Sequence, residues 1–255
     1  MGLMGEGLLA IWNDIDPALE DDYNLWHTQE HLPERIGTDG FLAGRRYVNQ
    51  GLAQQRYFTL YEAQTLAVFN SAPYLGRLNA PTAWTQAMMP GFANYVRGAC
   101  QVEYSHSGAL GGKLAAIRIA LNDAAPLLES AESLSGQLRA DGRIVGVHLA
   151  SCSADVTLTP TKERSFRRGT SEDVFDALVL IEAVNIPALD GALAQLRRHL
   201  HGVLGDNHRA DSAYYELAYY LARDQAAAGS LRYSVSSRAA AAPARLAPMV
   251  EAEGP

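Results

Sequence analysis

Cysteine is scarce in this sequence, with Cys100 and Cys152 as the only two in 255 residues. Each lies in an apolar or strand-like run, and their spacing matches neither a disulfide framework nor a zinc motif. A chain of this length can bury one large core or two modest ones without disulfides or structural metals. We therefore expect two buried thiols and find no indication of an oxidising compartment.

Long hydrophobic runs and a signal-peptide pattern are also missing. No stretch approaches the roughly 18 apolar residues that a membrane span needs, and the first residues lack a charged flank followed by an apolar segment. Met1-Gly2 opens a myristoylation-like pattern, but Glu6 stands where Ser or Thr is required. These absences predict a cytoplasmic protein without a membrane partner.

Basic residues are in the minority, with 21 Lys and Arg against 28 Asp and Glu and a formal net charge of −7. Because a nucleic-acid-binding surface must neutralise phosphates, we expect no nucleic-acid partner. One basic segment, residues 157–170, is the exception and contains Lys162, Arg164, Arg167 and Arg168. We interpret it as a mobile surface loop.

Hydrophobic periodicity in the first hundred residues predicts the order β-α-β-β-α-β. The strands are expected at residues 7–15, 41–49, 57–63 and 93–104, and the helices at residues 16–31 and 66–89, the second interrupted near Pro73 and Pro81. Pro33 should end or kink the first helix, because proline removes a helical hydrogen bond. This order is the ferredoxin-like unit, an antiparallel sheet of four strands with two helices on one face.

The same order recurs after a glycine-rich linker at residues 107–112. Strands are expected at residues 113–121, 143–153, 174–184 and 213–222, and helices at residues 125–139 and 186–204. The prediction is an α+β protein of two tandem ferredoxin-like (βαββαβ) units. We assign residues 1–108 to the first, which carries the candidate site, and residues 109–236 to a diverged second. Residues 237–255, rich in Ala and Pro, should be a disordered tail.

Residues of catalytic type crowd into the first unit. Tyr23, Trp26, His27 and Glu30 follow i, i+3, i+4 spacing on one helix face, and His31 lies beside that face. If this face meets the sheet, a buried carboxylate and a neighbouring imidazole can exchange a proton. The alternative is that the two aromatics belong to the core and the polar residues form a solvated helix flank.

Histidines also raise the question of a metal or haem. Residues 27–31 match the H-x-x-E-H pattern of one zinc peptidase group, but a zinc site needs a third ligand and a second shell. We therefore predict no metal and no cofactor. In the second unit, no haem-attachment signature accompanies four histidines that we interpret as surface residues: His148, His199, His201 and His208.

Arg45 and Arg46 are adjacent on a predicted strand, so their side chains must point to opposite faces. One of them should point into the packed side of the sheet or a cavity, where a guanidinium needs an anionic partner such as Glu30, Glu62 or a substrate carboxylate or enolate. Alternatively, the strand lies at an edge and both arginines reach solvent.

Further aromatic and amide groups are expected to approach the same space. Tyr61 lies on the next strand, and Asn79, Thr82 and Trp84 cluster in the second helical stretch. A pocket lined in this way suits a flat, oxygenated small organic molecule.

Three short motifs carry a family resemblance. Trp26-x-x-x-Glu30-His31-x-Pro33-Glu34, then Gly40-Phe41, then Arg45-Arg46-Tyr47 resemble EthD-type proteins of the dimeric α+β barrel superfamily, over roughly residues 7–104. The resemblance implies that two such units pack sheet against sheet into a barrel. The duplication places this barrel within one chain, which would then be a monomer or a homodimer.

The resemblance leaves the reaction open, since this superfamily includes muconolactone isomerases, polyketide cyclases, quinone-forming monooxygenases, aldoxime dehydratases and chlorite-dismutase-like haem proteins. By motif position it implies His31 and Glu30 as site residues, with Arg46 as an anion binder.

We predict a cofactor-independent enzyme that transfers protons on a small cyclic or aromatic carbonyl compound, as an isomerase, cyclase or cofactor-free monooxygenase of catabolism or secondary metabolism. His31 or His27 would be the acid or base, Glu30 would orient it, and Arg46 would stabilise an enolate. The substrate-binding residues would be Tyr23, Trp26, Tyr61, Asn79 and Trp84. The alternatives are a non-catalytic small-molecule-binding accessory protein and a haem-dependent enzyme of the same superfamily.

Overall fold

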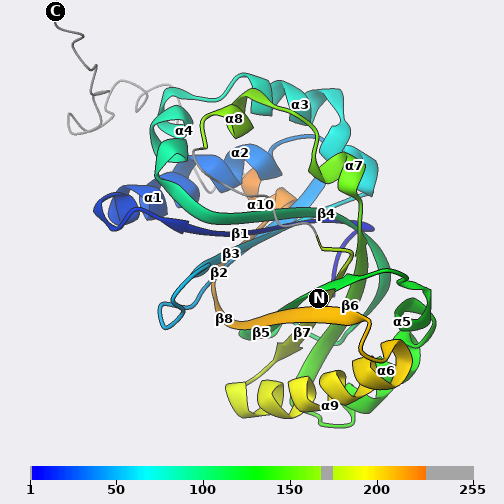
Figure 1. The fold of residues 1–255 in the computed structure, drawn as a ribbon. Coiled ribbons are helices and arrows are strands. Elements are labelled where there is room, and N and C mark those ends of the chain that lie inside the picture. Colours follow the sequence, from blue (N-terminus) through cyan, green and yellow to red (C-terminus); the bar gives the residue numbers. More distant parts are fainter. Residues whose placement is uncertain (1, 168–174, 228–255) are drawn as a thin grey trace, which may run out of the picture.

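The strands of the computed structural model form one closed antiparallel barrel in the order β1-β3-β2-β8-β5-β7-β6-β4 (Figure 1). The structure describes residues 2–167 and 175–227; the predicted tail at residues 237–255 and residues 168–170 of the predicted basic loop lie outside them. The strands are β1 (Gly7–Ile15), β2 (Phe41–Val48), β3 (Tyr57–Ala63), β4 (Phe92–Ser107), β5 (Lys113–Leu121), β6 (Ile144–Cys152), β7 (Ala177–Ala183) and β8 (His208–Ala222).

Helices connect the strands of each half. The first half has α1 (Glu20–Trp26), α2 (Leu32–Ile36), α3 (Ala72–Asn79) and α4 (Ala83–Met88), with a π-helix at His27–His31 and 3-10 helices at Pro17–Leu19, Leu66–Asn70 and Met89–Gly91. The second half has α5 (Ala125–Glu129), α6 (Ala131–Arg139), α7 (Ala154–Thr157), α8 (Lys162–Ser165), α9 (Ile186–Leu204) and α10 (Arg223–Ala227). Within this described part, no helix has the length and apolar character of a transmembrane helix.

The strand order repeats within the barrel. The first half contributes β4-β1-β3-β2 and the second contributes β8-β5-β7-β6, which is the same ferredoxin-like order twice. Two seams, β2 with β8 and β4 with β6, join the halves. The predicted α+β fold of two tandem ferredoxin-like units that close into an intrachain barrel is therefore confirmed.

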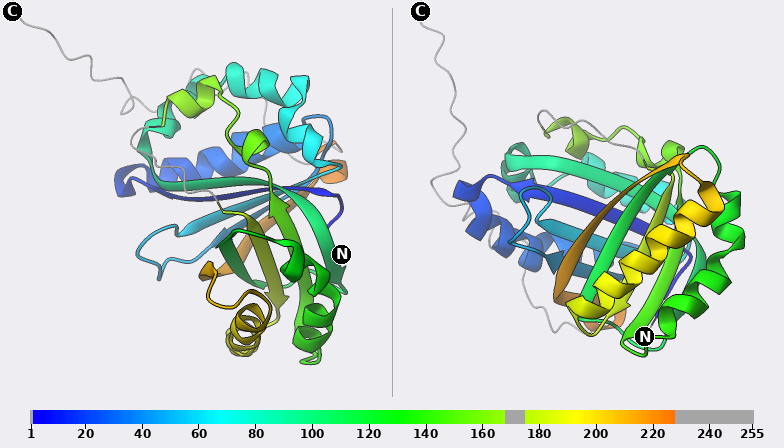
Figure 2. Two further views of the ribbon diagram at one scale, coloured as in Figure 1. Left: turned by 45° about the vertical axis from the view of Figure 1, so that its right-hand side comes forward. Right: turned by 60° about the horizontal axis from the view of Figure 1, so that its bottom comes forward.

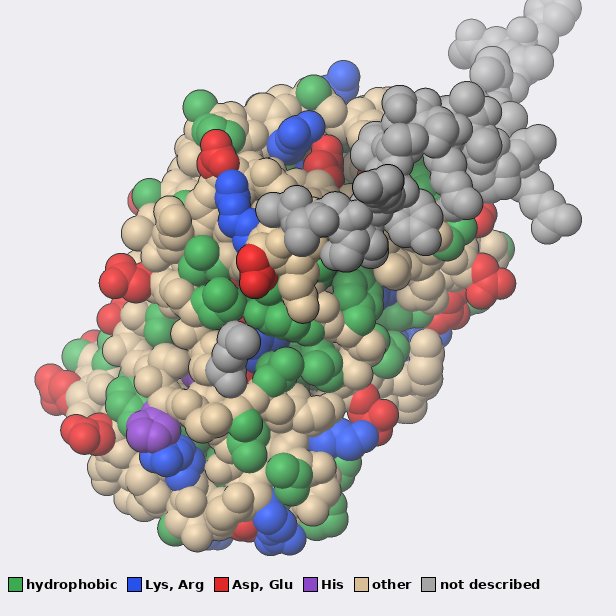
Figure 3. Space-filling view, turned by 180° about the vertical axis from the view of Figure 1, so that it is seen from behind, with side chains coloured by type: hydrophobic (Ala, Val, Ile, Leu, Met, Phe, Trp, Pro, Cys, Tyr) green, Lys and Arg blue, Asp and Glu red, His purple; other side chains and the backbone are tan. Residues whose placement is uncertain are grey.

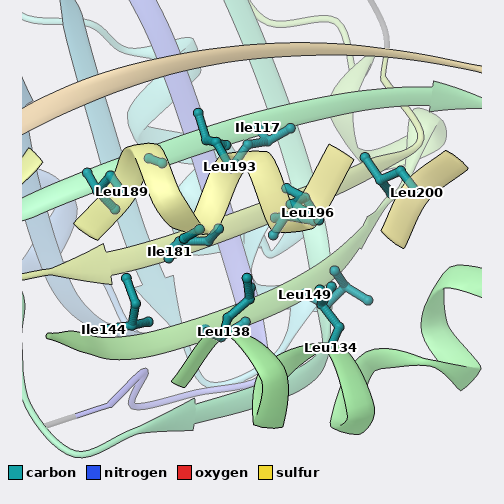
Figure 4. Close-up of a cluster of buried hydrophobic side chains, with 14 of the residues drawn as sticks. Ile117, Leu134, Leu138, Ile144, Leu149, Ile181, Leu189, Leu193, Leu196 and Leu200 are labelled. Carbon is teal, nitrogen blue, oxygen red and sulfur yellow. The ribbon is translucent and has the colours of Figure 1, made fainter. Parts of the chain in front are cut away.

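Helices cover the barrel on two opposite sides (Figure 2). The helices of the first half lie on one side, and α5, α6 and α9 lie on the other. Helices cover the outer face of each half of the sheet, and the barrel interior covers the inner face. As a result, β3 and β7 are buried along their whole length. The second-half layer is filled by branched aliphatic side chains (Figure 4): Ile117, Leu134, Leu138, Ile144, Leu149, Ile181, Leu189, Leu193, Leu196 and Leu200.

The barrel interior combines an apolar cluster with a buried charge cluster. Gly98 is required in the apolar part, because a Cβ there would lie 2.2 Å from the Phe175 ring. In the charge cluster, Arg45 Nε donates to Glu62 Oε1 at 2.6 Å and Arg45 Nη1 to Glu182 Oε1 at 2.8 Å. His148 Nε2 lies 3.1 Å from the same Glu182 oxygen.

This cluster tests two predictions. Arg45 and Arg46 do point to opposite faces, and Glu62 is the anionic partner of Arg45 as expected. The interpretation of His148 as a surface histidine was wrong, because its side chain is only 1% exposed. The sequence lacked a signal for this burial, because the partner Glu182 is 34 residues away.

Pro33 does not end the first helix, which continues to Ile36. A π-turn at residues 27–31 precedes Pro33, and in it the N–H of Leu32 donates to the carbonyl of His27, five residues back. The next helical segment, α2, starts at Leu32, so Pro33 stands in its first turn, where a missing N–H costs no helical bond. The expected breaks near Pro73 and Pro81 are confirmed.

The basic segment at residues 157–170 is not the mobile loop that we expected, as far as the structure describes it. It includes the end of α7 and all of α8, and the buried Glu163 carboxylate pairs with Arg35 of the first half. On the face opposite to that of Figure 1, basic and acidic side chains are scattered singly and hydrophobic ones gather near the middle (Figure 3).

Removal of the Arg45 charge should be strongly destabilising. Arg45→Met leaves the carboxylates of Glu62 and Glu182 in the barrel without this cation, which costs about 3–5 kcal/mol for a buried pair. Urea denaturation at neutral pH measures the loss. Arg143→Met is the control, because its ion pair with Asp141 is at the surface and its loss should leave the unfolding midpoint unchanged. Equal midpoints for both variants would contradict the prediction.

Candidate functional site

A cavity lies between the outer face of the first-half sheet and the helices that cover it. Its volume is about 50 Å³, and the whole space between the lining side chains, part of which is open to solvent, is about 740 Å³. The sheet contributes Ile11, Thr59 and Tyr61, the first helical stretch contributes His27 and His31, and the α7–α8 segment of the second half contributes Thr157, Thr161 and Glu163. The site is thus built in the first half and covered by a segment of the second.

Aromatic side chains make up much of the cavity wall. The Trp26 ring packs against the His31 ring, with centroids 4.2 Å apart and planes tilted by 34°. The Tyr23 ring also lies near Trp26, with centroids 5.9 Å apart. Four further rings line the space: Phe69, Tyr74, Phe92 and Tyr95. A flat apolar ring is the kind of group that such walls accommodate.

His27 is held through both ring nitrogens. Nδ1 lies 2.9 Å from the hydroxyl of Tyr219 on β8, and Nε2 lies 3.3 Å from the hydroxyl of Thr59 on β3. The Tyr219 hydroxyl also reaches the His27 backbone carbonyl, at 3.1 Å. Burial lowers the pKa of His27 well below its usual value, and nearby Arg46 lowers it further. This imidazole is neutral near pH 7 and fixed in orientation.

His31 differs because its Nδ1 is buried and has no hydrogen-bond partner among the described residues. Burial lowers the pKa of His31 well below its usual value, and Arg35, Arg46 and Arg167 add to the effect. The hydroxyl of Tyr61, in the same cavity, also lacks a partner within the described chain, and burial raises the pKa of Tyr61 well above its usual value. The cavity therefore holds a neutral imidazole and a protonated phenol, both with bonding capacity left over.

Arginines give the cavity a positive character in an acidic protein. Arg35 donates to Glu34 at 2.7 Å and pairs with Glu163. The Arg167 guanidinium carbon lies 3.9 Å from the centre of the Tyr95 ring, and its Nε is buried without a hydrogen bond in the described part of the chain. Arg97 donates to the Thr157 carbonyl at 2.6 Å.

Of the residues predicted from the sequence, the structure brings Tyr23, Trp26, His27, His31 and Tyr61 together at this cavity. The alternative of a solvated helix flank was wrong for His27 and Glu30, which are 3% and 7% exposed. The π-turn that carries both histidines places their ring centroids 5.6 Å apart. Among the described residues, no group of three His, Cys, Asp or Glu side chains gathers around a common point.

Two predicted catalytic residues do not line the cavity. The carboxylate of Glu30 accepts a hydrogen bond from the Thr82 hydroxyl at 2.5 Å and from the Thr85 hydroxyl at 3.4 Å, next to α4. The Arg46 guanidinium lies 4.6 Å from the centres of the Tyr23 and Tyr57 rings and donates to the Tyr23 hydroxyl at 3.2 Å. Both residues support groups that line the cavity.

Two predicted binding residues also lie elsewhere. The side-chain oxygen of Asn79 accepts a hydrogen bond from the Lys162 N–H at 3.0 Å, so it anchors α8. Trp84 packs, partly buried, against the cluster around Met88 and Tyr23.

Sequence reasoning missed Arg35, Glu163, Arg167 and Tyr219. A signal existed for Arg167, in the basic composition of its segment; Tyr219 reaches the site only because the barrel closes through β8.

The buried histidines predict acid-sensitive stability. Their folded-state pKa values lie below 6.5, so the unfolded chain takes up protons that the folded chain cannot, and stability falls as the pH drops below about 6.5. The expected slope is about 1.4 kcal/mol per histidine per pH unit. Urea denaturation between about pH 7.5 and pH 5.5 should show a smaller slope for His31→Gln. His201→Gln, at an exposed ring, is the control and should keep the wild-type slope.

Comparisons with known proteins support the fold. No protein-family model and no curated protein sequence matches the chain. The chain is similar in structure to a protein from Fusobacterium nucleatum proposed to be a monooxygenase, with 9% identity, 86% of this chain and 96% of that chain covered, and a TM-score of 0.54. It is also similar to an anthrone oxidase-like protein (11% identity, 85% and 92% covered, TM-score 0.51).

A third similar structure is a variant of chlorite dismutase from Candidatus Nitrospira defluvii, with 10% identity, 88% of this chain and 94% of that chain covered, and a TM-score of 0.51. Identities this low carry information on the fold alone. The chain therefore has the fold of the dimeric α+β barrel superfamily, as expected, whereas the narrower EthD-type assignment stays a prediction.

Proposed function

We propose that this protein is an enzyme that moves a proton on a small cyclic or aromatic carbonyl compound, with His31 as the general base. One observation carries the proposal: the buried Nδ1 of a neutral His31 and the buried hydroxyl of Tyr61 lie in the same cavity. Neither atom has a hydrogen-bond partner among the described residues. A base must keep a free lone pair near pH 7, and a lowered pKa provides it.

The proposed step is enolisation. His31 Nδ1 takes a proton from the carbon next to the substrate carbonyl. The electron pair of that C–H bond forms a C=C bond, and the π pair of the carbonyl moves to its oxygen. The Tyr61 O–H and the Arg167 guanidinium stabilise the resulting enolate. Return of the proton from His31 to another carbon completes an isomerisation, and attack of the enolate carbon on a second carbonyl completes a cyclisation.

Other side chains act through the groups that line the cavity. Tyr219 and Thr59 hold His27, which packs beside His31. Glu30 ties the π-turn to α4 through Thr82. We therefore assign Glu30 and Arg46 a positioning role and transfer the anion-stabilising role, at first given to Arg46, to Arg167.

The small volume of the cavity limits what can bind. A cavity of about 150 Å³ holds benzene, so a cavity of about 50 Å³ admits a carbonyl and one edge of a ring. The remainder of the substrate would occupy the open part of the cavity. A haem fits these residues poorly, because both His27 nitrogens are engaged and the His31 ring packs against Trp26, which leaves no room for a macrocycle.

Deuterium exchange tests this function before any product has been identified. Small cyclic ketones, 1,3-diketones and hydroxyaryl ketones are incubated with the protein in D2O, and loss of the α-proton signal is followed by NMR. We expect exchange of at least one class by the wild type, a decrease of about 100-fold or more in His31→Ala, and a decrease of about 100-fold in Tyr61→Phe.

His199→Ala is the matched control, because this histidine bonds to Ser130 in the second half, away from the cavity. It should exchange at the wild-type rate, and all variants should remain folded at the assay temperature. Unchanged exchange in His31→Ala would refute the assignment of the base. A measurable dissociation constant without exchange would support the non-catalytic binding role, and a Soret band in the purified protein would support haem chemistry.

A further inference from the structure

The two cysteines of the chain face each other across one barrel seam. Cys100 on β4 and Cys152 on β6 are direct partners in the register of these antiparallel strands. Fifty-one residues separate them in sequence, and both were expected to be buried thiols, which holds for Cys100 but not for the half-buried Cys152. Their pairing is a result of barrel closure, because β4 belongs to the first half and β6 to the second.

The hydrogen bonds around the pair define its geometry. The Ser153 N–H donates to the Ala99 carbonyl at 2.8 Å, so the seam hydrogen bond lies at this flanking pair. The Cys152 N–H points the other way and donates to the Asp176 carbonyl at 2.8 Å. By the alternation of antiparallel ladders, Cys100 and Cys152 form a non-hydrogen-bonded pair, with α-carbons about 4.5 Å apart.

That separation lies within the range that disulfides span, about 4.4–6.8 Å between α-carbons. Directly opposite residues also project to the same face of a sheet, and here both side chains pack with the interior cluster of the barrel. A bond between the two sulfurs therefore needs no strand shift.

The two thiols have different surroundings. Cys100 is fully buried, whereas Cys152 is half-buried and its sulfur lies 3.6 Å from the Thr157 hydroxyl. The hydrogen bond from the Cys100 thiol lowers the pKa of Cys152, and the same interaction together with burial raises the pKa of Cys100. Cys152 is thus the thiol that ionises first and is reached first by a solute.

We propose that Cys100 and Cys152 are a redox-modification site that forms a reversible intrachain disulfide on exposure to hydrogen peroxide. The Cys152 thiolate attacks one peroxide oxygen, the O–O bond breaks, and hydroxide leaves as water after taking a proton, so that Cys152 becomes a sulfenic acid. The Cys100 sulfur then attacks the sulfur of Cys152 and releases a second water. Two thiols are oxidised and one peroxide is reduced to two waters.

The bond would act on the cavity as well as on the seam. Thr157 contacts Cys152 and also accepts the N–H of Ala99 at 2.9 Å, and it begins the segment that brings Glu163 to the cavity. Oxidation draws the Cys152 sulfur toward Cys100 and away from Thr157. The inference stands independently of the proposed enzyme activity, because it rests on the seam alone.

Intact mass spectrometry tests the proposal on the wild-type chain. After peroxide treatment and alkylation in denaturant, we expect a loss of two hydrogens, no alkylated thiol, and one peptide that links Cys100 to Cys152. The thermal midpoint should rise by about 5–15 °C, because the crosslink restricts the unfolded chain. A thiol reductant should reverse both changes.

Two single variants separate the steps. Cys100→Ser should stop at a sulfenic acid on Cys152 that dimedone traps, and Cys152→Ser should keep Cys100 reduced. Two alkylatable thiols in the peroxide-treated wild type would overturn the proposal, as would an intermolecular disulfide or overoxidation of Cys152 with Cys100 still free. The wild-type result decides the matter even if a variant does not fold.

Discussion

The buried charge cluster around Arg45 constrains the rest of the molecule, because a buried guanidinium is costly unless carboxylates pair with it. Glu62 belongs to the first half and Glu182 to the second, and Arg45 bonds to both. The two carboxylates play matching parts, since each also accepts a backbone N–H just before the first strand of its half, from Met4 and Gly111, each at 2.7 Å. Burial alone would raise the pKa of Glu182, but His148 and Arg45 lower it, so this carboxylate is charged. The charge cluster is satisfied only when the barrel is closed.

The two halves have the same strand order, but the layers between sheet and helices differ in what fills them. In the second half, the space between sheet and helices is filled by leucine and isoleucine side chains (Figure 4). In the first half, the equivalent space contains aromatic rings and two histidines, which cannot interdigitate as closely, and a cavity remains. The second half then contributes what the cavity lacks: a cover from α8, through Glu163, and an anchor from β8, through Tyr219. Neither half holds the complete site.

The π-turn at residues 27–31 links the sequence motif to the candidate chemistry. It carries His27 and His31 into the layer next to the sheet, where burial and nearby arginines keep both neutral. One of them is held through both ring nitrogens, and the other keeps a buried nitrogen without a partner among the described residues. This difference between two neighbouring histidines supports the assignment of His31 as the base. The fold itself leaves the reaction open, since the similar structures carry different names and share about a tenth of their residues with this chain.

The sequence by itself determined the elements and their repetition, since hydrophobic periodicity and turn residues act locally: β1, β3, β5 and α9 occupy the predicted ranges. It also identified the histidines and aromatic residues of the first helix. Only the tertiary structure decided which polar groups are used by the cavity, because their partners come from distant strands: Arg45 turned inward to Glu182, Arg46 engaged Tyr23, and Glu163 reached Arg35. The pairing of Cys100 with Cys152 has the same origin. Contacts across a seam depend on register and closure, which local patterns do not encode.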